Sequence, residues 1–154
     1  LLISAWKDIQ QKNSDWELVL IGNGDLKEST IGLKNIKILN WLQPEELPEK
    51  IKKSGCFIVP SQWEPWAVTV HEFCAAGMPI ILSDKVGARN TFLIDNYNGY
   101  TFKSNNIESL KNALLKVINN SDETLFQMGK RSHKMSKKIN PEISAASLLS
   151  CIKN

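Results

Sequence analysis

Apolar residues along this chain follow two different spacings, and each spacing predicts its own kind of element. In residues 1–12 they recur at the three- and four-residue intervals of a helical stripe. This stripe consists of Leu1, Leu2, Ala5, Trp6 and Ile9. Elsewhere, short continuous apolar runs beside glycine, proline or asparagine are typical of strands. These runs lie at residues 16–21, 35–39, 56–59, 79–82 and 100–102.

Helical spacing returns between the strand-like runs. We expect a helix beginning at residues 43–47, one over residues 66–76, and further helices from residue 106 to residue 152, the last opened by Asn140 and Pro141. Strands that alternate with helices predict an open parallel sheet with helices on both faces. The predicted fold class is therefore α/β and Rossmann-like. In such sheets ligands bind beyond the carboxyl ends of the strands.

Length and composition fit one globular domain. The chain has 154 residues, of which 42% are hydrophobic and 23% charged, and a chain of this size can bury roughly 70% of its unfolded surface. No apolar run approaches the roughly 18 residues of a membrane span, and the first residues lack the basic start of a signal peptide. We expect a cytoplasmic protein, either free or peripheral at the inner face of the membrane.

Charge and cysteine content narrow the classes of partner. A net charge of +3 is too small to imply nucleic acid, so we expect no nucleic-acid partner. The basic run at residues 130–138 favours a solvated helix face over contact with acidic lipid. Cys56, Cys74 and Cys151 are odd in number and have no metal-like spacing, which predicts buried thiols in a reducing compartment.

The segment SQWEPWAVTVHE, residues 61–72, places two glutamates directly after a strand-like run. If a helix begins near Trp66, its first amides are free to hold an anion such as phosphate. Glu64 would be repelled by that anion, so it suits the neutral hydroxyls of a sugar, and Glu72 suits those of a ribose. The alternative is that Glu64 caps the helix and Glu72 is solvated. Trp63 either packs under the loop or lines the sugar pocket.

Other chemistry has less support in the sequence. The turn Gly22-Asn-Gly24 follows a strand, but Lys27 stands where a dinucleotide-binding fingerprint has its third glycine. His71 and His133 have no nucleophile at a recognisable spacing. No Asp-x-Asp pair occurs, which removes the most obvious holder of a divalent metal on a diphosphate. We expect a site without metal or other cofactor.

The order of motifs over residues 16–102 resembles the C-terminal half of the retaining family 4 glycosyltransferases, which have the two-domain GT-B fold. The resemblance rests on WELVLIGNG, IKILNWLQPEEL, GCFIVPSQWEPWAVTVHEFCAAGMPIILSD and VGARNTFLIDNYNGYTF. The third segment is the most specific, because Glu64 and Glu72 match the family's pair of glutamates separated by seven residues. The helical tail up to Asn154 also fits, so the resemblance covers nearly the whole chain.

The resemblance implies a role for each matching residue. Glu64, which we assign to the catalytic position, would contact hydroxyls of the donor sugar, and Glu72 would hold the nucleotide ribose. The backbone amides after Glu64 would bind the donor sugar and phosphate, and the base would lie against main chain after the strand at residues 36–40. The implied substrate-binding residues are Glu64, Trp66, Ala67, Val68, Glu72 and Leu42.

Three departures from the family pattern bear on activity. Ala67 stands where glycine is common, and Thr91 stands where an acid is usual. The family's first strand, with the arginine and lysine that bind the diphosphate, would precede Leu1, and no Lys or Arg near Glu64 in the sequence clearly replaces them. We therefore expect residues 1–154 to be a C-terminal domain fragment without its acceptor-binding N-terminal domain. Such a fragment would be inactive and at most bind donor weakly.

The sequence thus predicts the donor-nucleotide domain of a retaining, metal-independent glycosyltransferase of the hexosyltransferase type. The parent enzyme would move a sugar from a nucleotide-diphosphate donor to a carbohydrate or lipid-linked acceptor, as in polysaccharide or glycan biosynthesis. In the family the leaving phosphate assists the acceptor, so Glu64 would orient the sugar. The alternatives are a GT-B-like nucleotide-sugar epimerase and a non-catalytic nucleotide-binding domain.

Overall fold

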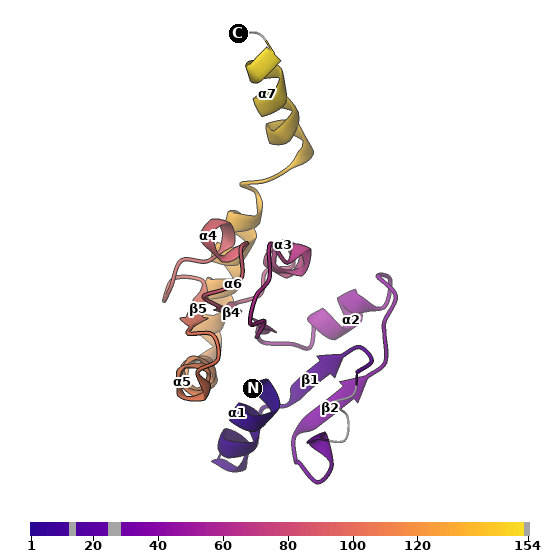
Figure 1. Ribbon diagram of the computed structural model, residues 1–154, viewed down its shortest axis with the longest axis vertical. Coiled ribbons are helices and arrows are strands. Elements are labelled where there is room, and N and C mark those ends of the chain that lie inside the picture. The colour runs from indigo at the N-terminus through magenta and orange to yellow at the C-terminus, as the bar shows by residue number, and fades with distance from the viewer. Residues whose placement is uncertain (13–14, 25–28, 153–154) are drawn as a thin grey trace.

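The computed structural model describes residues 1–12, 15–24 and 29–152, so Lys27 lies outside the described residues. Helices and strands alternate through the first two thirds of this part of the chain, and helices follow (Figure 1). In chain order the elements are α1 Leu2–Ile9, η1 Gln10–Lys12, β1 Leu18–Ile21, β2 Ile36–Leu39, α2 Leu47–Ile51, β3 Phe57–Val59, α3 Val68–Ala75, β4 Ile80–Ser83, α4 Arg89–Phe92, β5 Gly99–Phe102, α5 Ile107–Ile118, α6 Asp122–Ser136 and α7 Pro141–Ile152.

All strand pairs are parallel, but the described strands hydrogen-bond as two sheets. One sheet contains β1 and β2, and the other has the order β3-β4-β5. The indole of Trp16, just before β1, lies against Gly55, just before β3, where an added Cβ would come within 2.8 Å of the ring. The ring therefore leaves no room for a side chain at position 55. The predicted Rossmann-like α/β class is confirmed, although the described strands do not form one continuous sheet.

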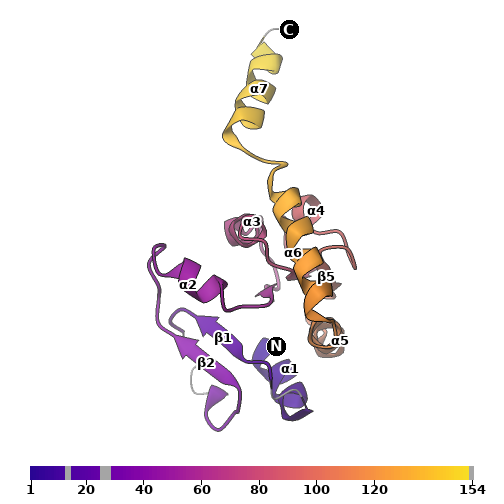
Figure 2. The ribbon, with the colours of Figure 1, turned by 180° about the vertical axis from the view of Figure 1, so that it is seen from behind.

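Strand β4 carries the hydrophobic core on both of its faces. Ile80, Ile81, Leu82 and Ser83 have no exposed surface. Ile81 packs with α1 and α5, whereas Ile80 and Leu82 pack in a second cluster with residues of α3 and α4. Because successive strand residues point to opposite faces, helices cover both faces of this sheet, as predicted. Figure 2 shows the molecule from the opposite side, with α6 in front of the strands.

The cysteines differ in their exposure. Cys74 is buried in α3, Cys56 is half-buried and Cys151 is exposed on α7. Burial raises the pKa of the Cys56 and Cys74 thiols to about 12, so both stay protonated at neutral pH. The prediction of buried thiols is confirmed for Cys74 and wrong for Cys151.

Helix α2 begins later than the sequence pattern predicts. Residues 43–46 form a turn in which the Glu46 amide donates to the Gln43 carbonyl at 2.9 Å and the Gln43 amide donates to the Glu46 carboxylate at 2.8 Å. Leu47 is the first helical residue, and Pro48 lies in the first turn. Residues 43–46 therefore form a turn closed by the Glu46 carboxylate where the sequence predicted the first turn of the helix.

Helices α3 and α6 lie against each other with very little separation. A Cβ on Gly129 of α6 would come within 2.1 Å of the carbonyl oxygen of Gly77, which follows α3. The ring nitrogens of two histidines bond to carbonyl oxygens across this junction. His71 Nε2 lies 2.8 Å from the Ser136 oxygen, and His133 Nδ1 lies 2.7 Å from the Ala75 oxygen. Both histidines therefore fix α3 to α6.

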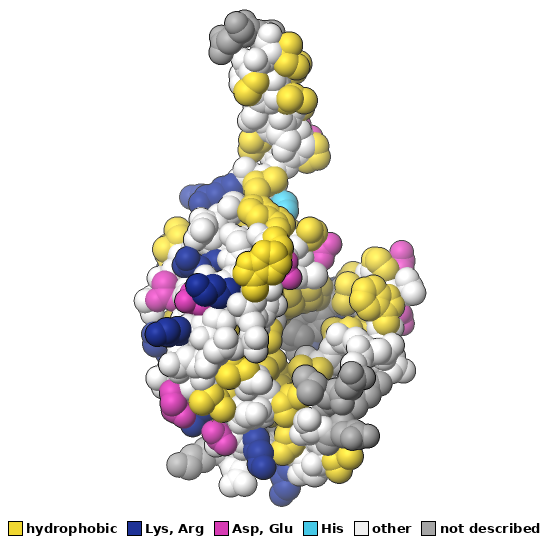
Figure 3. All heavy atoms as spheres, in the orientation of Figure 1, with side chains coloured by type: hydrophobic (Ala, Val, Ile, Leu, Met, Phe, Trp, Pro, Cys, Tyr) yellow, Lys and Arg dark blue, Asp and Glu magenta, His cyan; other side chains and the backbone are white. Residues whose placement is uncertain are grey.

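Helix α7 extends away from the rest of the molecule (Figures 1 and 2). Its start is the predicted one, because the Asn140 side chain accepts a hydrogen bond from the Ile143 amide at 2.7 Å. None of its described side chains is buried, and apolar side chains are visible along it in Figure 3. Within the described ranges, the structure contains no helix with the length and apolarity needed to cross a membrane.

Candidate functional site

The loop after β3 is held in place by the segment that follows β4. Ser83 Oγ donates to the Ser61 carbonyl at 2.6 Å, and the Glu64 amide donates to the Lys85 carbonyl at 3.1 Å. The Gly87 amide in turn donates to the Glu64 carbonyl at 2.9 Å. The loops that follow β3 and β4 are therefore hydrogen-bonded to each other. Both the amide and the carbonyl of Glu64 take part in these bonds.

Gly87 permits this close approach. An added Cβ there would lie 1.9 Å from the Pro65 carbonyl oxygen, which is far too close for any side chain. Sequence reasoning identified neither Ser83 nor Gly87 as part of the site. The glycine is visible in the sequence VGARN, but its contact with the loop of Pro65 is not, because the contact joins segments that are about twenty residues apart in the chain.

Helix α3 begins at Val68, two residues after the predicted start at Trp66. The cause is Ala67, whose backbone is left-handed with φ 69° and ψ 82° and so stands outside the helix as its N-cap. A left-handed alanine costs roughly 1–2 kcal/mol because its Cβ approaches the backbone. Glycine, which the resemblance implies is common at this position, would adopt the same conformation without that cost.

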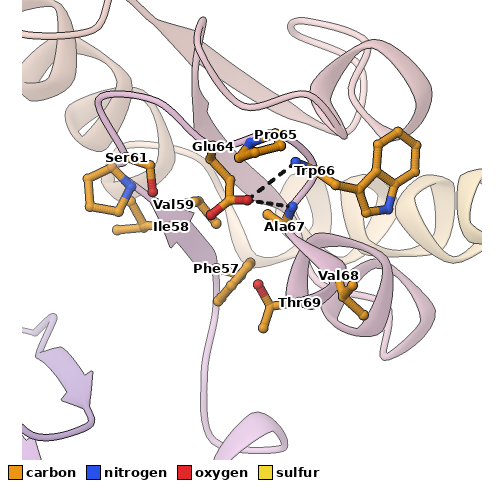
Figure 4. Close-up of a pocket in the computed structure, with 11 residues that line it drawn as sticks. Phe57, Ile58, Val59, Ser61, Glu64, Pro65, Trp66, Ala67, Val68 and Thr69 are labelled. Carbon is orange, nitrogen blue, oxygen red and sulfur yellow. Dashed lines mark hydrogen bonds between the residues drawn. The ribbon is translucent and has the colours of Figure 1, made fainter.

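The Glu64 carboxylate binds the two amides that were expected to be free. Its Oε1 accepts hydrogen bonds from the amides of Trp66 at 3.3 Å and Ala67 at 3.1 Å (Figure 4). Both amides lie before Val68, the first helical residue, and among the described residues no side chain caps α3. The alternative that Glu64 caps the helix is therefore wrong, and so is the prediction that the amides of Trp66 and Ala67 are free. Within residues 29–152, Glu64 Oε2 has no hydrogen-bond partner.

An open pocket of about 590 Å³ lies beside this carboxylate. Its walls are β3 with the start of its following loop, residues 57–61, and the segment from Glu64 into the first turn of α3, residues 64–69. In Figure 4 the Trp66 indole points away from Glu64, so Trp66 offers the pocket its backbone. The predicted residues Glu64, Trp66, Ala67 and Val68 all line this one pocket.

The first turn of α3 provides two further amides. Among the described residues, the amides of Val68 and Thr69 have no hydrogen-bond partner, whereas the Val70 amide donates to the Ala67 carbonyl at 3.0 Å. Both unbonded amides belong to residues that line the pocket. Free amides at a helix N-terminus, together with the helix dipole, favour an anion at that point.

Glu72 and Leu42 do not line this pocket. Glu72 is exposed on α3, four residues after Val68, so it lies on the same face of the helix one turn further along. Leu42 is half-buried and follows β2, which belongs to the other sheet. Their roles toward ribose and base remain predictions.

Two cationic residues lie in the segment that is bonded to the Glu64 loop. Lys85 accepts the Glu64 amide through its carbonyl, and Arg89 follows Ala88, whose amide donates to the Trp66 carbonyl at 3.0 Å. The chain separates these cations from Glu64 by more than twenty residues, so the sequence order does not show their proximity. In the described part of the chain neither side chain forms an ion pair, and no group of three metal-binding side chains occurs.

Comparison with known proteins agrees with this architecture. The family model described as "Glycosyl transferases group 1" matches residues 1–138. An uncharacterized glycosyltransferase of Methanocaldococcus jannaschii is 33% identical over 142 residues, which is 87% of this chain and 39% of that protein. The chain therefore belongs to the group 1 glycosyl transferases.

Two further relatives are better described. A UDP-Gal:alpha-D-GlcNAc-diphosphoundecaprenol alpha-1,3-galactosyltransferase of Escherichia coli is 28% identical over 124 residues, covering 75% of this chain and 31% of that enzyme. A crystal structure of an S. aureus TarM variant with fondaparinux, alpha-GlcNAc-glycerol and UDP has a TM-score of 0.84 and 19% identity, covering 97% of this chain and 31% of that one. The fold is the C-terminal domain type of GT-B glycosyltransferases, and the chain spans less than two fifths of the length of these relatives.

Proposed function

We propose that this chain is the donor-binding domain of a retaining, metal-independent glycosyltransferase. The parent enzyme transfers a hexose from a nucleotide-diphosphate sugar to a carbohydrate or lipid-linked acceptor held by an N-terminal domain. The observation that carries the proposal is the junction of Glu64 with the first turn of α3, where a carboxylate and unbonded helix amides share one pocket. The lipid-linked acceptor in the name of the E. coli relative supports the acceptor class.

In this proposal different residues bind the phosphate, the sugar and the ribose of the donor. The unbonded amides of Val68 and Thr69 receive a phosphate oxygen, since a helix N-terminus binds anions without a metal ion. The free Oε2 of Glu64 accepts from a sugar hydroxyl, while Oε1 keeps the carboxylate in place through the amides of Trp66 and Ala67. Glu72, one turn along α3, accepts from the ribose hydroxyls. Each contact is to a neutral hydroxyl or a phosphate, as the donor requires.

In the proposed reaction the acceptor attacks the sugar from the face that the leaving phosphate occupies, which retains the configuration. A phosphate held at the first turn of α3 stays on the face of the sugar that it leaves, where its oxygen can accept the proton of the incoming hydroxyl. Positive charge is needed where the leaving diphosphate develops negative charge. Lys85 and Arg89 are the cations whose backbones lie beside the Glu64 loop, and within this domain we assign that neutralisation to them.

Substitution of the two glutamates in the full-length protein tests the proposal. We expect Glu64→Ala to lower kcat by roughly two orders of magnitude, because a sugar contact is lost in the transition state. We expect Glu72→Ala to raise KM for the donor roughly tenfold, because one charge-assisted hydrogen bond is lost. Transfer from UDP- and GDP-hexoses measures kcat and KM, and calorimetry with UDP measures nucleotide affinity.

Glu64→Gln separates the sugar contact from the hydrogen bonds within the loop. The glutamine carbonyl oxygen can still accept from the amides of Trp66 and Ala67, so the variant keeps these two bonds. If Glu64→Gln has full activity and Glu64→Ala loses only thermal stability, Glu64 only stabilises the loop and its assignment to the sugar is wrong. Unchanged turnover and unchanged UDP binding in both alanine variants would refute the proposed donor site.

A further inference from the structure

Trp63 lies at the rim of the pocket with most of its surface in solvent. The pocket is lined by residues 57–61 and 64–69, so neither Gln62 nor Trp63 lines it. The exposed fraction of Trp63 is 75%, which excludes packing under the loop. Neither position that the sequence suggested for this indole, under the loop or in the sugar pocket, is the one that it occupies.

The backbone on either side of Trp63 is fixed, although its side chain is free. The Ser61 carbonyl accepts from Ser83 Oγ at 2.6 Å, and the Gln62 carbonyl accepts from Ser104 Oγ at 3.4 Å. The Glu64 amide donates to the Lys85 carbonyl at 3.1 Å. These partners belong to the carboxyl ends of β4 and β5. The fold therefore fixes the backbone from which a large, exposed apolar ring projects, directly before a residue that lines the pocket. Exposed loop positions of this kind are where binding residues are typically found.

We propose that Trp63 is a specificity-determining residue that stacks against a sugar ring of the acceptor. The inference rests on the proposed function. In that function Glu64 holds the donor sugar inside the pocket, so the acceptor must reach the reacting carbon from outside the pocket. Trp63 directly precedes Glu64, does not line the pocket and is 75% exposed. The other aromatic residue of the loop is less available, since the Trp66 ring lies against Phe92 at a centroid distance of 6.1 Å.

The chemistry of this rim fits a carbohydrate. One face of a hexose ring consists largely of C–H groups, whose positive edges suit the negative face of an aromatic ring. Exposed polar residues belong to the same loops: Gln62 precedes Trp63 in the chain, and the exposed Asp84 accepts from the Ser104 amide at 2.8 Å. Aromatic side chains combined with a few polar groups are the usual composition of a site for a small ligand.

Kinetics of the full-length protein test the assignment. Trp63→Ala and Trp63→Phe would be compared with the unmodified enzyme, using UDP- and GDP-hexoses as donors and the methyl glycosides of glucose, galactose, mannose and N-acetylglucosamine as acceptors. Donor hydrolysis without acceptor and calorimetry with UDP report on the donor site alone. We expect Trp63→Ala to raise KM for the glycosylated acceptor roughly tenfold and to leave donor hydrolysis and UDP affinity unchanged. Trp63→Phe, which keeps an aromatic face, should recover most of the loss.

Phe126→Ala provides the matched control, because Phe126 is an exposed aromatic residue of α6 that does not line the pocket. It should leave every rate unchanged. Unchanged acceptor KM in Trp63→Ala, an equal loss of donor hydrolysis, or no transfer to any glycoside by an enzyme that hydrolyses donor would overturn the assignment of Trp63. Loss of binding to vesicles of anionic phospholipid, with transfer to methyl glycosides intact, would also overturn it in favour of membrane contact. An unmodified enzyme that neither hydrolyses nor transfers any donor would refute the proposed function itself.

Discussion

At the scale of single residues, Glu64 and Ala67 decide the shape of the pocket. The Glu64 carboxylate satisfies two amides that precede the helix, and the left-handed backbone of Ala67 turns the chain into α3. The two effects depend on each other, because Ala67 supplies both an amide to the carboxylate and the turn that directs the next amides into the pocket. The conformation of Ala67 costs free energy that glycine would not require.

Ala67→Gly should therefore stabilise the protein. Relief of the left-handed alanine contributes roughly 1–2 kcal/mol, and the greater freedom of glycine in the unfolded chain removes about 0.4–1 kcal/mol. We expect a net increase of about 0.5–1 kcal/mol in the free energy of unfolding, measured by urea denaturation. Ala75→Gly, at the right-handed end of the same helix, is the control and should lower stability. A loss of stability in Ala67→Gly would show that the left-handed conformation is not strained.

At the scale of elements, the junction of α3 with α6 fixes the helix that carries the pocket. Gly129 and Gly77 bring the two backbones together, and His71 and His133 each bond to a carbonyl oxygen across the junction. The His71 ring also stacks on Phe92 of α4 with a centroid distance of 4.7 Å. The position of α3 is thus set by contacts from its middle, at His71, to the residues just after its end.

Gly129→Ala should weaken this junction. The new methyl group would lie 2.1 Å from the Gly77 carbonyl oxygen, so the helices must separate, and overpacking of this kind typically costs about 1–3 kcal/mol. We expect a lower urea midpoint and a lower melting temperature. The matched change Gly24→Ala adds a methyl group with no atom within 4 Å and should have an effect within about 0.5 kcal/mol. Equal effects of the two substitutions would contradict the close contact.

The elements could be predicted from the sequence more fully than their junctions. The run at residues 56–59 predicted β3 because a buried parallel strand is continuously apolar. The start of α3 was misplaced because Pro65 favours a helix start, while nothing in the sequence marks an alanine as left-handed. The hydrogen bonds from the amides of Trp66 and Ala67 to Glu64 were not predicted, because both alternatives for Glu64 assumed a helix that begins near Trp66. Ser83 and Gly87 act through contacts between loops, and no local pattern reports such contacts.

At the scale of the whole molecule, the chain divides into a body with two core clusters on either side of β4 and an unattached terminal helix. Helix α7 has no buried side chain among its described residues. It nevertheless carries large apolar side chains at 46–70% exposure, namely Ile143, Leu148, Leu149 and Ile152. Its apolar surface contributes nothing to the stability of the body.

Removal of the residues from Pro141 onward should therefore leave the body as stable as before. A segment without buried contacts has a local stability close to zero and does not take part in global unfolding. We expect the melting temperature and the urea midpoint to stay the same, with a change below about 1 kcal/mol in the free energy of unfolding. A loss of several kcal/mol would mean that α7 packs against the body in solution.

Strand β4 also determines at which temperature the pocket is lost on heating. Its residues have no exposed surface and are paired with strands on both sides, so its amides belong to the region that exchanges with solvent only through global opening. Ser83, its last residue, holds the loop of Glu64. The anchor of the donor pocket is thus part of the slowest-exchanging unit of the chain, and heat should remove the site and the fold in a single cooperative step.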